Sequence, residues 1–322
     1  MPFGEGEALV CVDGEQAAQQ LQANVYYPNP IFIAGQQSLP LQTVDSFLSE
    51  MYDDNMEVHV QDPDLKVANG AQHIKRVTIG KVKEHFAKPC NGSPWNLLEL
   101  ATHYDEGIRP GFLNSEDCRL LTKLKFPNRG DTASRKGYDP GWKEVEKWAL
   151  IAQAGALTEP HQDSHGYSTF ITINQGIFGY GWLSNPTGEQ RAAWAASPDH
   201  YIDNGRWRYA ILRPGQTVYF PTATIHFVFR LPAAGNTLAF GGHVLRNSQI
   251  VRWVKCLIDE KKNPYLANED LTVSAPAYLG RVSKFVKQAL QRDDEAEMAK
   301  WGGKDAILEF LTLKAEFDKM KK

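Results

Sequence analysis

The middle of this chain is a succession of short runs that are rich in β-branched and aromatic residues and are separated by proline and glycine. Such runs predict β-strands, and their close spacing favours an antiparallel sandwich or barrel over an alternating α/β fold. Pro214-Gly215 and Pro221 end two of the runs, as expected at turns. The runs span residues 147–153, 169–174, 207–213, 216–220, 226–231 and 237–240. We therefore predict a mainly β jelly roll with helical additions.

Two histidines and an aspartate within this region have the residue types of a metal site. His161 and Asp163 lie two apart, so on an extended strand their side chains project from the same face. His226 follows His161 by 65 residues (226 − 161), at the start of another predicted strand. In a jelly roll the two strands would meet at one mouth, and the three side chains would form the two-histidine, one-carboxylate triad of non-haem Fe(II) sites. The alternative is a surface His-x-Asp pair that never meets His226.

Several longer motifs accompany the triad between Trp95 and Cys256. They are Asn96-Leu-Leu-Glu-Leu, Lys147-Trp-Ala-Leu-Ile, Thr158-Glu-Pro-His-Gln-Asp, Gly215-Gln-Thr-Val-Tyr-Phe-Pro-Thr, Ile225-His226 and Leu238-Ala-Phe-Gly-Gly-His-Val-Leu. In type, order and spacing they resemble the JmjC-domain family of Fe(II)- and 2-oxoglutarate-dependent oxygenases, with the closest likeness to its F-box and PHD-finger histone lysine demethylase branch. The resemblance implies a double-stranded β-helix, which is a cupin-like jelly roll, and implies that His161, Asp163 and His226 hold Fe(II).

The resemblance also implies residues for the co-substrate, 2-oxoglutarate. Its 2-oxo acid end would chelate the iron, and its far carboxylate would meet a hydroxyl group, here Thr158, with Asn96 as a further polar contact. The lysine of the family falls at Phe178, and Ile171 stands where the branch usually has a tyrosine. Phe178 cannot neutralise a carboxylate, and a buried carboxylate without a partner costs several kcal/mol. Either another cation binds the far carboxylate, or 2-oxoglutarate is not bound in the manner of the family.

Arg230 is the candidate for that cation. It follows His226 by four residues on the same predicted strand, so the two side chains share a face. A guanidinium could hold the far carboxylate in a bidentate fork. The alternative is that Arg230 extends to solvent at the strand end, beside Leu231-Pro232. His243 is another candidate pocket residue, or else a structural histidine.

Three regions are predicted along the chain. Residues 1–90 form a mixed α/β region that buttresses the barrel, with helices near 43–52 and 78–86. Residues 91–256 form the jelly-roll core. Two inserts interrupt this core, at 128–142 and 184–206. The first insert is a lid or a plain solvated loop, and the second contains a helix at 189–196. Residues 257–322 are helical, with apolar stripes in 278–291 and 305–320 that pack within the domain or form a homodimer.

Composition limits the partners and the compartment. A formal net charge of −3 gives no basic surplus, so a nucleic-acid partner is not expected. No run approaches the roughly 20 apolar residues that span a bilayer, and the first residues lack a secretory pattern. The four cysteines are scattered without Cys-x-x-Cys spacing, which predicts free thiols in an intracellular, reducing compartment.

Three functions remain open at this point. The first is an Fe(II)- and 2-oxoglutarate-dependent hydroxylase or N-methyl-lysine demethylase-like enzyme that oxidises a C–H bond of a protein or small-molecule substrate. Phe178 favours two others: a JmjC scaffold that has lost co-substrate binding and acts by interaction, and a cupin-type metal dioxygenase that needs no 2-oxo acid. The sequence does not name the substrate, because the loops that contact substrates in such folds carry no transferable pattern.

Overall fold

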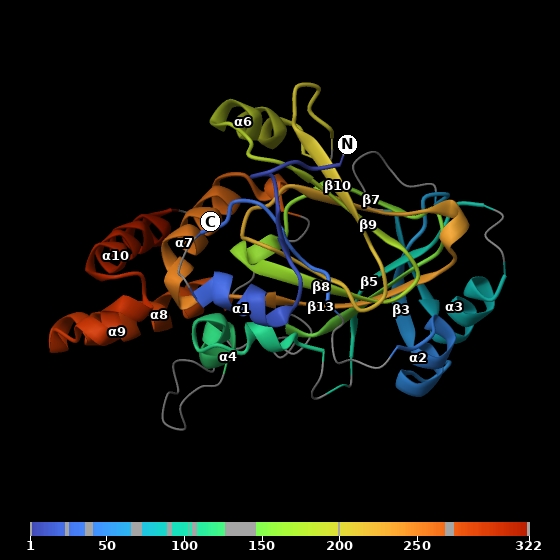
Figure 1. Cartoon of the computed structure of the whole chain (residues 1–322), viewed down its shortest axis with the longest axis horizontal. Helices are drawn as coiled ribbons and strands as arrows, with labels where there is room; N and C mark the ends of the chain where they lie inside the picture. The colour runs from blue at the N-terminus through green and yellow to red at the C-terminus, as the bar shows by residue number, and fades with distance from the viewer. Residues whose placement is uncertain are drawn as a thin grey trace.

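The computed structural model describes residues 2–22, 26–35, 41–65, 73–88, 92–102, 104, 108–125, 146–198, 200–267 and 274–320. Within them the chain forms two β-sheets with helices around them (Figure 1), consistent with the predicted mainly β class with helical additions. No helix in these ranges is long and apolar enough to cross a membrane. The predicted insert at 128–142 lies outside the described residues.

The large sheet has the strand order β1-β2-β11-β8-β13-β6-β5-β3-β4. Its paired strands are antiparallel, except that β1 and β2 are parallel. The N-terminal strands β1 to β5 therefore extend the sheet on both sides of its centre. The strands are β1 (Leu9–Cys11), β2 (Ile31–Ile33), β3 (Glu57–Gln61), β4 (Ile74–Thr78), β5 (Asn96–Ala101), β6 (Trp148–Ala152), β8 (Ser168–Gln175), β11 (Thr217–Phe220) and β13 (Thr237–Val244).

The small sheet has the order β10-β9-β12-β7, with all of its pairs antiparallel. Its strands are β7 (Leu157–His161), β9 (Phe178–Leu183), β10 (Trp207–Leu212) and β12 (His226–Arg230). In Figure 1 it lies opposite the large sheet, and buried side chains from both sheets form one apolar cluster that includes Ile171, Val218, Phe178, Tyr180 and Val228. The two sheets therefore pack face to face.

The strand β12 shows how the sequence sets the two faces of the small sheet. His226, Val228 and Arg230 are buried, whereas the alternate residues Phe227 and Phe229 are only partly buried. The rings of Phe227 and Phe229 lie over Gly181 and Gly179 of β9, where an added Cβ would stand within 2.0 and 2.3 Å of them. The outer face therefore has room for these rings because β9 has glycine at both positions, and the other face of β12 points to the interior.

Helices cover the other side of the large sheet and one end of the molecule. Near the N-terminus, α1 (Gly14–Gln22), α2 (Val44–Met51) and α3 (Ile79–Phe86) pack on the large sheet. Thr43 caps α2 with a capping box, and Thr78 caps α3, which confirms the two predicted helices. The predicted helix in the second insert is α6 (Gly188–Ala196), capped by Thr187. A short helix α4 (Leu120–Lys125) joins the C-terminal helical cluster.

The C-terminal helices are α7 (Ile250–Lys262), α8 (Ser274–Arg292), α9 (Glu295–Lys300) and α10 (Lys304–Lys319). Residues of the predicted apolar stripes of α8 and α10 join residues of α7 in one cluster, with Leu279, Val282 and Phe310 among its buried members, although Leu308 of the α10 stripe is exposed. These stripes therefore pack within the chain, as one of the two predictions had it. A homodimer stays a prediction.

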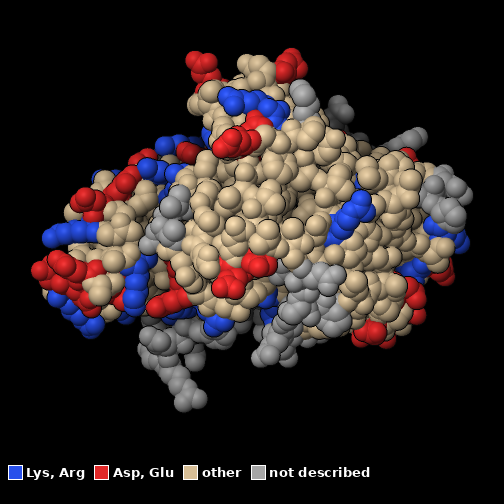
Figure 2. All heavy atoms as spheres, viewed as in Figure 1, with Lys and Arg blue, Asp and Glu red and all other residues tan. Residues whose placement is uncertain are grey.

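Charged residues are unevenly spread over the face in Figure 2. They gather over the C-terminal helices and α6, where Lys and Arg alternate with Asp and Glu, and the centre of this face is almost free of charge. The basic groups on this face therefore form no continuous stripe of the kind that binds nucleic acid. The described cysteines Cys11, Cys118 and Cys256 are buried free thiols, as predicted, and Cys90 lies outside the described residues.

Candidate metal centre

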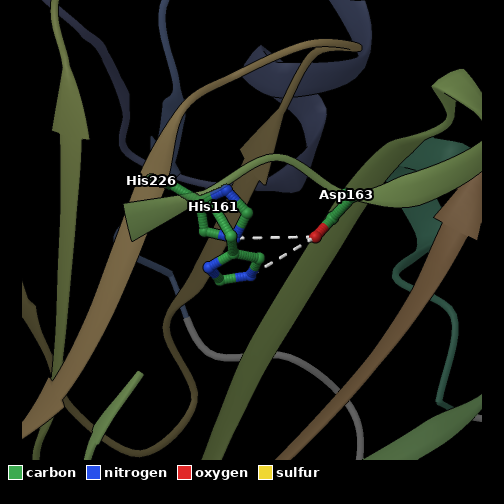
Figure 3. A group of neighbouring side chains, drawn as sticks. All are labelled: His161, Asp163 and His226. Carbon is green, nitrogen blue, oxygen red and sulfur yellow. Dashed lines mark ion pairs between the residues drawn. The ribbon is translucent and has the colours of Figure 1, made fainter. Parts of the chain in front are cut away.

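The predicted triad converges at the mouth between the two sheets. His161 is the last residue of β7, Asp163 immediately precedes the short 3₁₀ turn η4 (Ser164–Gly166), and His226 is the first residue of β12. Because β7 and β12 pair antiparallel with His226 directly opposite His161, the two imidazoles are neighbours across the strands. Figure 3 shows the three side chains pointing toward one another. The alternative of a surface pair that never meets His226 is wrong.

The distances within the triad suit a single ion. Asp163 Oδ1 lies 3.7 Å from the Nε2 atom of His161 and 3.7 Å from that of His226. The two imidazole rings are 4.2 Å apart between centroids. Donor atoms that each bind one transition-metal ion at roughly 2.1 Å are at most about 4.2 Å apart. The carboxylate and either imidazole are therefore close enough to share an ion.

Backbone hydrogen bonds fix the orientation of both imidazoles. His161 Nδ1 lies 2.8 Å from the carbonyl oxygen of Glu159, and His226 Nδ1 lies 3.0 Å from that of Thr224. Since a carbonyl only accepts, each Nδ1 must carry the proton. Each Nε2 then presents its lone pair toward Asp163, which is the arrangement found for metal-ligating histidines.

The carboxylate of Asp163 is held from its other side. Thr169 donates its hydroxyl proton to Asp163 Oδ2, and Thr169 Oγ1 lies 2.9 Å from Nδ1 of His243. Because a threonine hydroxyl has one proton to donate, its oxygen accepts from His243. His243 therefore supports the Asp163 carboxylate indirectly, through the Thr169 hydroxyl.

The protonation states also suit metal binding. Desolvation raises the pKa of Asp163. The nearby His226, His243 and His161, together with the Thr169 hydroxyl, lower the pKa by more than desolvation raises it, so it lies below its ordinary value. Desolvation, with His161 adding to it, lowers the pKa of His226 to about 4. At neutral pH the centre therefore has an ionised carboxylate and a neutral imidazole at His226, the forms that bind metal.

A pocket continues from the triad into the space between the sheets. Its atom-free volume is about 470 Å³, including the part open to solvent. Arg230 and Thr158 line it, as do His161, Asp163 and His226. The rest of the wall is mainly apolar and comes from both sheets: Leu98, Trp148, Leu150, Ile171, Phe220 and Val228, with Thr169 and His243 as further polar residues.

Arg230 is inside the protein, with only 2% of its surface exposed, so the alternative of a solvent-exposed arginine is wrong. Its Nε donates to Thr237 Oγ1 at 3.3 Å, and its guanidinium carbon lies 4.8 Å from the centre of the Phe178 ring. Neither Nη1 nor Nη2 has a hydrogen-bond partner among the described residues. Desolvation lowers the pKa of Arg230 to about 9, so the guanidinium is still charged at neutral pH.

The two remaining predicted residues lie side by side, but only one faces the pocket. Thr158 is on the pocket wall, and Asn96 stands behind it, donating from Nδ2 to Thr158 Oγ1 at 3.1 Å and to Gln61 Oε1 at 3.0 Å. Since Thr158 accepts from Asn96, its own proton is directed elsewhere. Asn96 therefore orients the hydroxyl rather than lining the pocket.

Sequence patterns did not point to Trp148 or Thr169 as parts of this site. Thr169 reaches Asp163 because β8 follows η4 closely, and Trp148 enters the pocket from β6. Trp148 Nε1 is buried and has no hydrogen-bond partner among the described residues. Neither role has a local signature in the sequence.

A comparison with models of known protein families finds no match to this chain.

Proposed function

We propose that this protein is an Fe(II)- and 2-oxoglutarate-dependent oxygenase of the JmjC type, and that its two facing sheets are the halves of a double-stranded β-helix. The observation that carries this proposal is the buried Arg230 guanidinium. Its two terminal nitrogens have no hydrogen-bond partner among the residues that the structure describes, and it lines the same pocket as the cluster of His161, Asp163 and His226. The pocket therefore combines a place for a metal with a place for an anion.

A buried, unpaired cation is unfavourable unless a ligand completes it. The natural partner of a guanidinium is a carboxylate or a phosphate, which it binds through two parallel hydrogen bonds. A strand advances about 3.3 Å per residue, so His226 and Arg230 are roughly 13 Å apart along β12. This spacing suits a short dicarboxylate held between a metal-bound end and the arginine side chain, and 2-oxoglutarate has that form.

The position of Arg230 also accounts for the lysine that is missing at Phe178. Phe178 on β9 and Arg230 on β12 are direct cross-strand partners. The side chains of such partners start only about 5 Å apart. A cation at either position can reach the same part of the pocket, so the charge that the resemblance places at 178 is supplied here from the neighbouring strand.

The residues of the chain divide the work between them. His161, Asp163 and His226 would hold the ion, oriented by the carbonyls of Glu159 and Thr224 and by the Thr169 hydroxyl. Arg230 and Thr158 would bind the far carboxylate, and the apolar wall excludes water. Bound iron and 2-oxoglutarate would supply the oxidation of a substrate C–H bond. Hydroxylation at an N-methyl group would lead to demethylation.

A cupin-type metal dioxygenase that uses no 2-oxo acid is the second candidate, because Phe178 provides no cation and Ile171, which lines the pocket, stands where the resemblance implies a tyrosine. Anaerobic titration of the full chain with Fe(II) and then 2-oxoglutarate separates the two. We expect a weak visible charge-transfer band that appears only when both are present. Metal binding without this band would favour the dioxygenase or a non-catalytic scaffold. Failure to bind any divalent metal would refute the metal centre itself.

A further inference from the structure

A buried carboxylate on the helix α7 contacts the turn that follows Asp163 of the candidate metal centre. Glu260, on the last turn of α7, is only 3% exposed. Its Oε2 accepts a hydrogen bond from the backbone N–H of His165 at 3.0 Å, and its Oε1 accepts from that of Gly166 at 3.1 Å. The thiol of Cys256 donates to Oε1 at 3.3 Å. The carboxylate therefore accepts hydrogen bonds from the second and third N–H groups of the turn that follows Asp163, those of His165 and Gly166.

This turn has a backbone conformation that needs support. His165 has φ of 63° and Gly166 has φ of 62°, so both are in the left-handed region. For a residue with a Cβ, such as His165, that conformation costs about 1–2 kcal/mol. Successive N–H groups in such a turn form a small concave anion site. The Glu260 carboxylate occupies that concavity.

Further contacts hold the same two residues through their carbonyl groups. Trp253, also on α7, donates from Nε1 to the carbonyl oxygen of His165 at 3.1 Å. Thr222 donates to the carbonyl oxygen of Gly166 at 2.9 Å. A Cβ on Gly166 would come within 3.1 Å of side-chain atoms of both Cys256 and Trp253, so the turn packs directly on α7.

The turn connects the two residues that determine where the Asp163 carboxylate lies. Asp163 precedes it and carries the carboxylate, and Thr169 follows it and donates to Oδ2. If the turn relaxes, the distance and angle between these two residues change. The direction of Oδ1, which faces both histidines at 3.7 Å, would change with them.

We propose that Glu260 is a positioning residue of the metal centre: its carboxylate holds residues 164–166 in the conformation that directs Asp163 toward His161 and His226. This inference rests on the proposed metal centre. It assigns to a C-terminal helix a part in metal binding, although no residue of that helix contacts the ion site.

The test uses Co(II) as the probe, added to the metal-free full chain and followed by calorimetry and by its visible spectrum. We expect Glu260→Ala to weaken Co(II) binding by about 10–100-fold, the range usual for partners that orient metal ligands. Glu260→Gln keeps one acceptor oxygen and should lose less affinity. Asp259→Asn is the matched control, because Asp259 is the exposed neighbour of Glu260 on α7, and it should bind Co(II) as the wild type does.

Three outcomes would go against the proposal. If Glu260→Ala is folded and binds Co(II) with wild-type affinity and spectrum, Glu260 has only a structural role. If Glu260→Ala does not fold, Glu260→Gln decides, and wild-type affinity in that variant overturns the inference. A wild-type chain that does not bind Co(II) would refute the metal centre as a whole, and this result is distinguishable from a loss confined to the Glu260 variants.

Discussion

Replacing Arg230 by methionine should increase the free energy of unfolding of the metal-free protein and abolish co-substrate binding. A pKa lowered from 12.5 to about 9 corresponds to about 5 kcal/mol of unfavourable free energy for the buried charged form. Because the folded pKa lies below the unfolded value, this cost is fully present at neutral pH and is relieved only above pH 9. The substitution also removes the contact with Phe178 and the bond to Thr237, worth about 1 kcal/mol each. The net expectation is stabilisation by roughly 2–3 kcal/mol.

The same substitution should remove the anion-binding end of the pocket. Two hydrogen bonds from a charged donor contribute about 1.5–3 kcal/mol each, so their loss weakens binding by roughly 3–6 kcal/mol. This corresponds to a loss of about 10²–10⁴ in affinity for 2-oxoglutarate. Metal affinity should not change, because Arg230 contacts none of the three proposed ligands. Since Phe178 is the cross-strand partner of Arg230, Phe178→Lys in the Arg230→Met background should restore part of the lost affinity.

Urea unfolding of the metal-free proteins measures the first effect, and anaerobic calorimetry with Fe(II)-loaded proteins measures the second. Arg213→Met, which changes an exposed arginine immediately after β10, is the control and should change neither the stability nor the affinity for 2-oxoglutarate. Arg230→Met with wild-type affinity for 2-oxoglutarate would refute the anion-binding role. A destabilised Arg230→Met protein would show that the guanidinium is not an uncompensated charge, and absence of rescue by Phe178→Lys would refute the explanation for the missing lysine.

Three further predictions concern the ligands, the sheet and the helix α7. Asp163→Asn keeps the size of the side chain and removes its charge, so Co(II) affinity measured by calorimetry should fall by more than about 100-fold; an unchanged value would remove Asp163 from the centre. Gly242→Ala should cost about 3 kcal/mol in urea unfolding, because its Cβ would lie 1.9 Å from the carbonyl oxygen of Glu146; a loss below about 0.5 kcal/mol would contradict this packing. Burial raises the pKa of Glu260 from 4.5 to about 7, so its contribution to stability is present below pH 4.5 and is lost as pH rises through 7. Relative to Glu260→Gln, the unfolding free energy of the metal-free wild type should therefore fall by roughly 3 kcal/mol between pH 4.5 and 8, and parallel pH profiles would contradict the shift.

Local patterns in the sequence were sufficient for much of the fold. Each of the six predicted runs corresponds to a strand, namely β6, β8, β10, β11, β12 and β13. The strand β9 was missed, because Gly179 and Gly181 interrupt its apolar pattern and glycine disfavours strands. Its strand conformation depends instead on neighbours, since Phe227 and Phe229 from β12 occupy the space above those glycines. This support comes from residues that are nearly 50 positions away in the chain.

The sequence indicated the residue types of the triad and, from the two-residue spacing of His161 and Asp163 in extended backbone, that these two side chains share a face. The pairing of β12 with β7 then brought His226 opposite His161. The other parts of the site come from the tertiary structure. It buried Arg230, placed it opposite Phe178, and brought Thr169 and Glu260 to the two sides of the turn after Asp163. Periodicity in the sequence predicts which face of an element a side chain occupies, whereas strand register and helix packing, which depend on distant segments, determine what that face contacts.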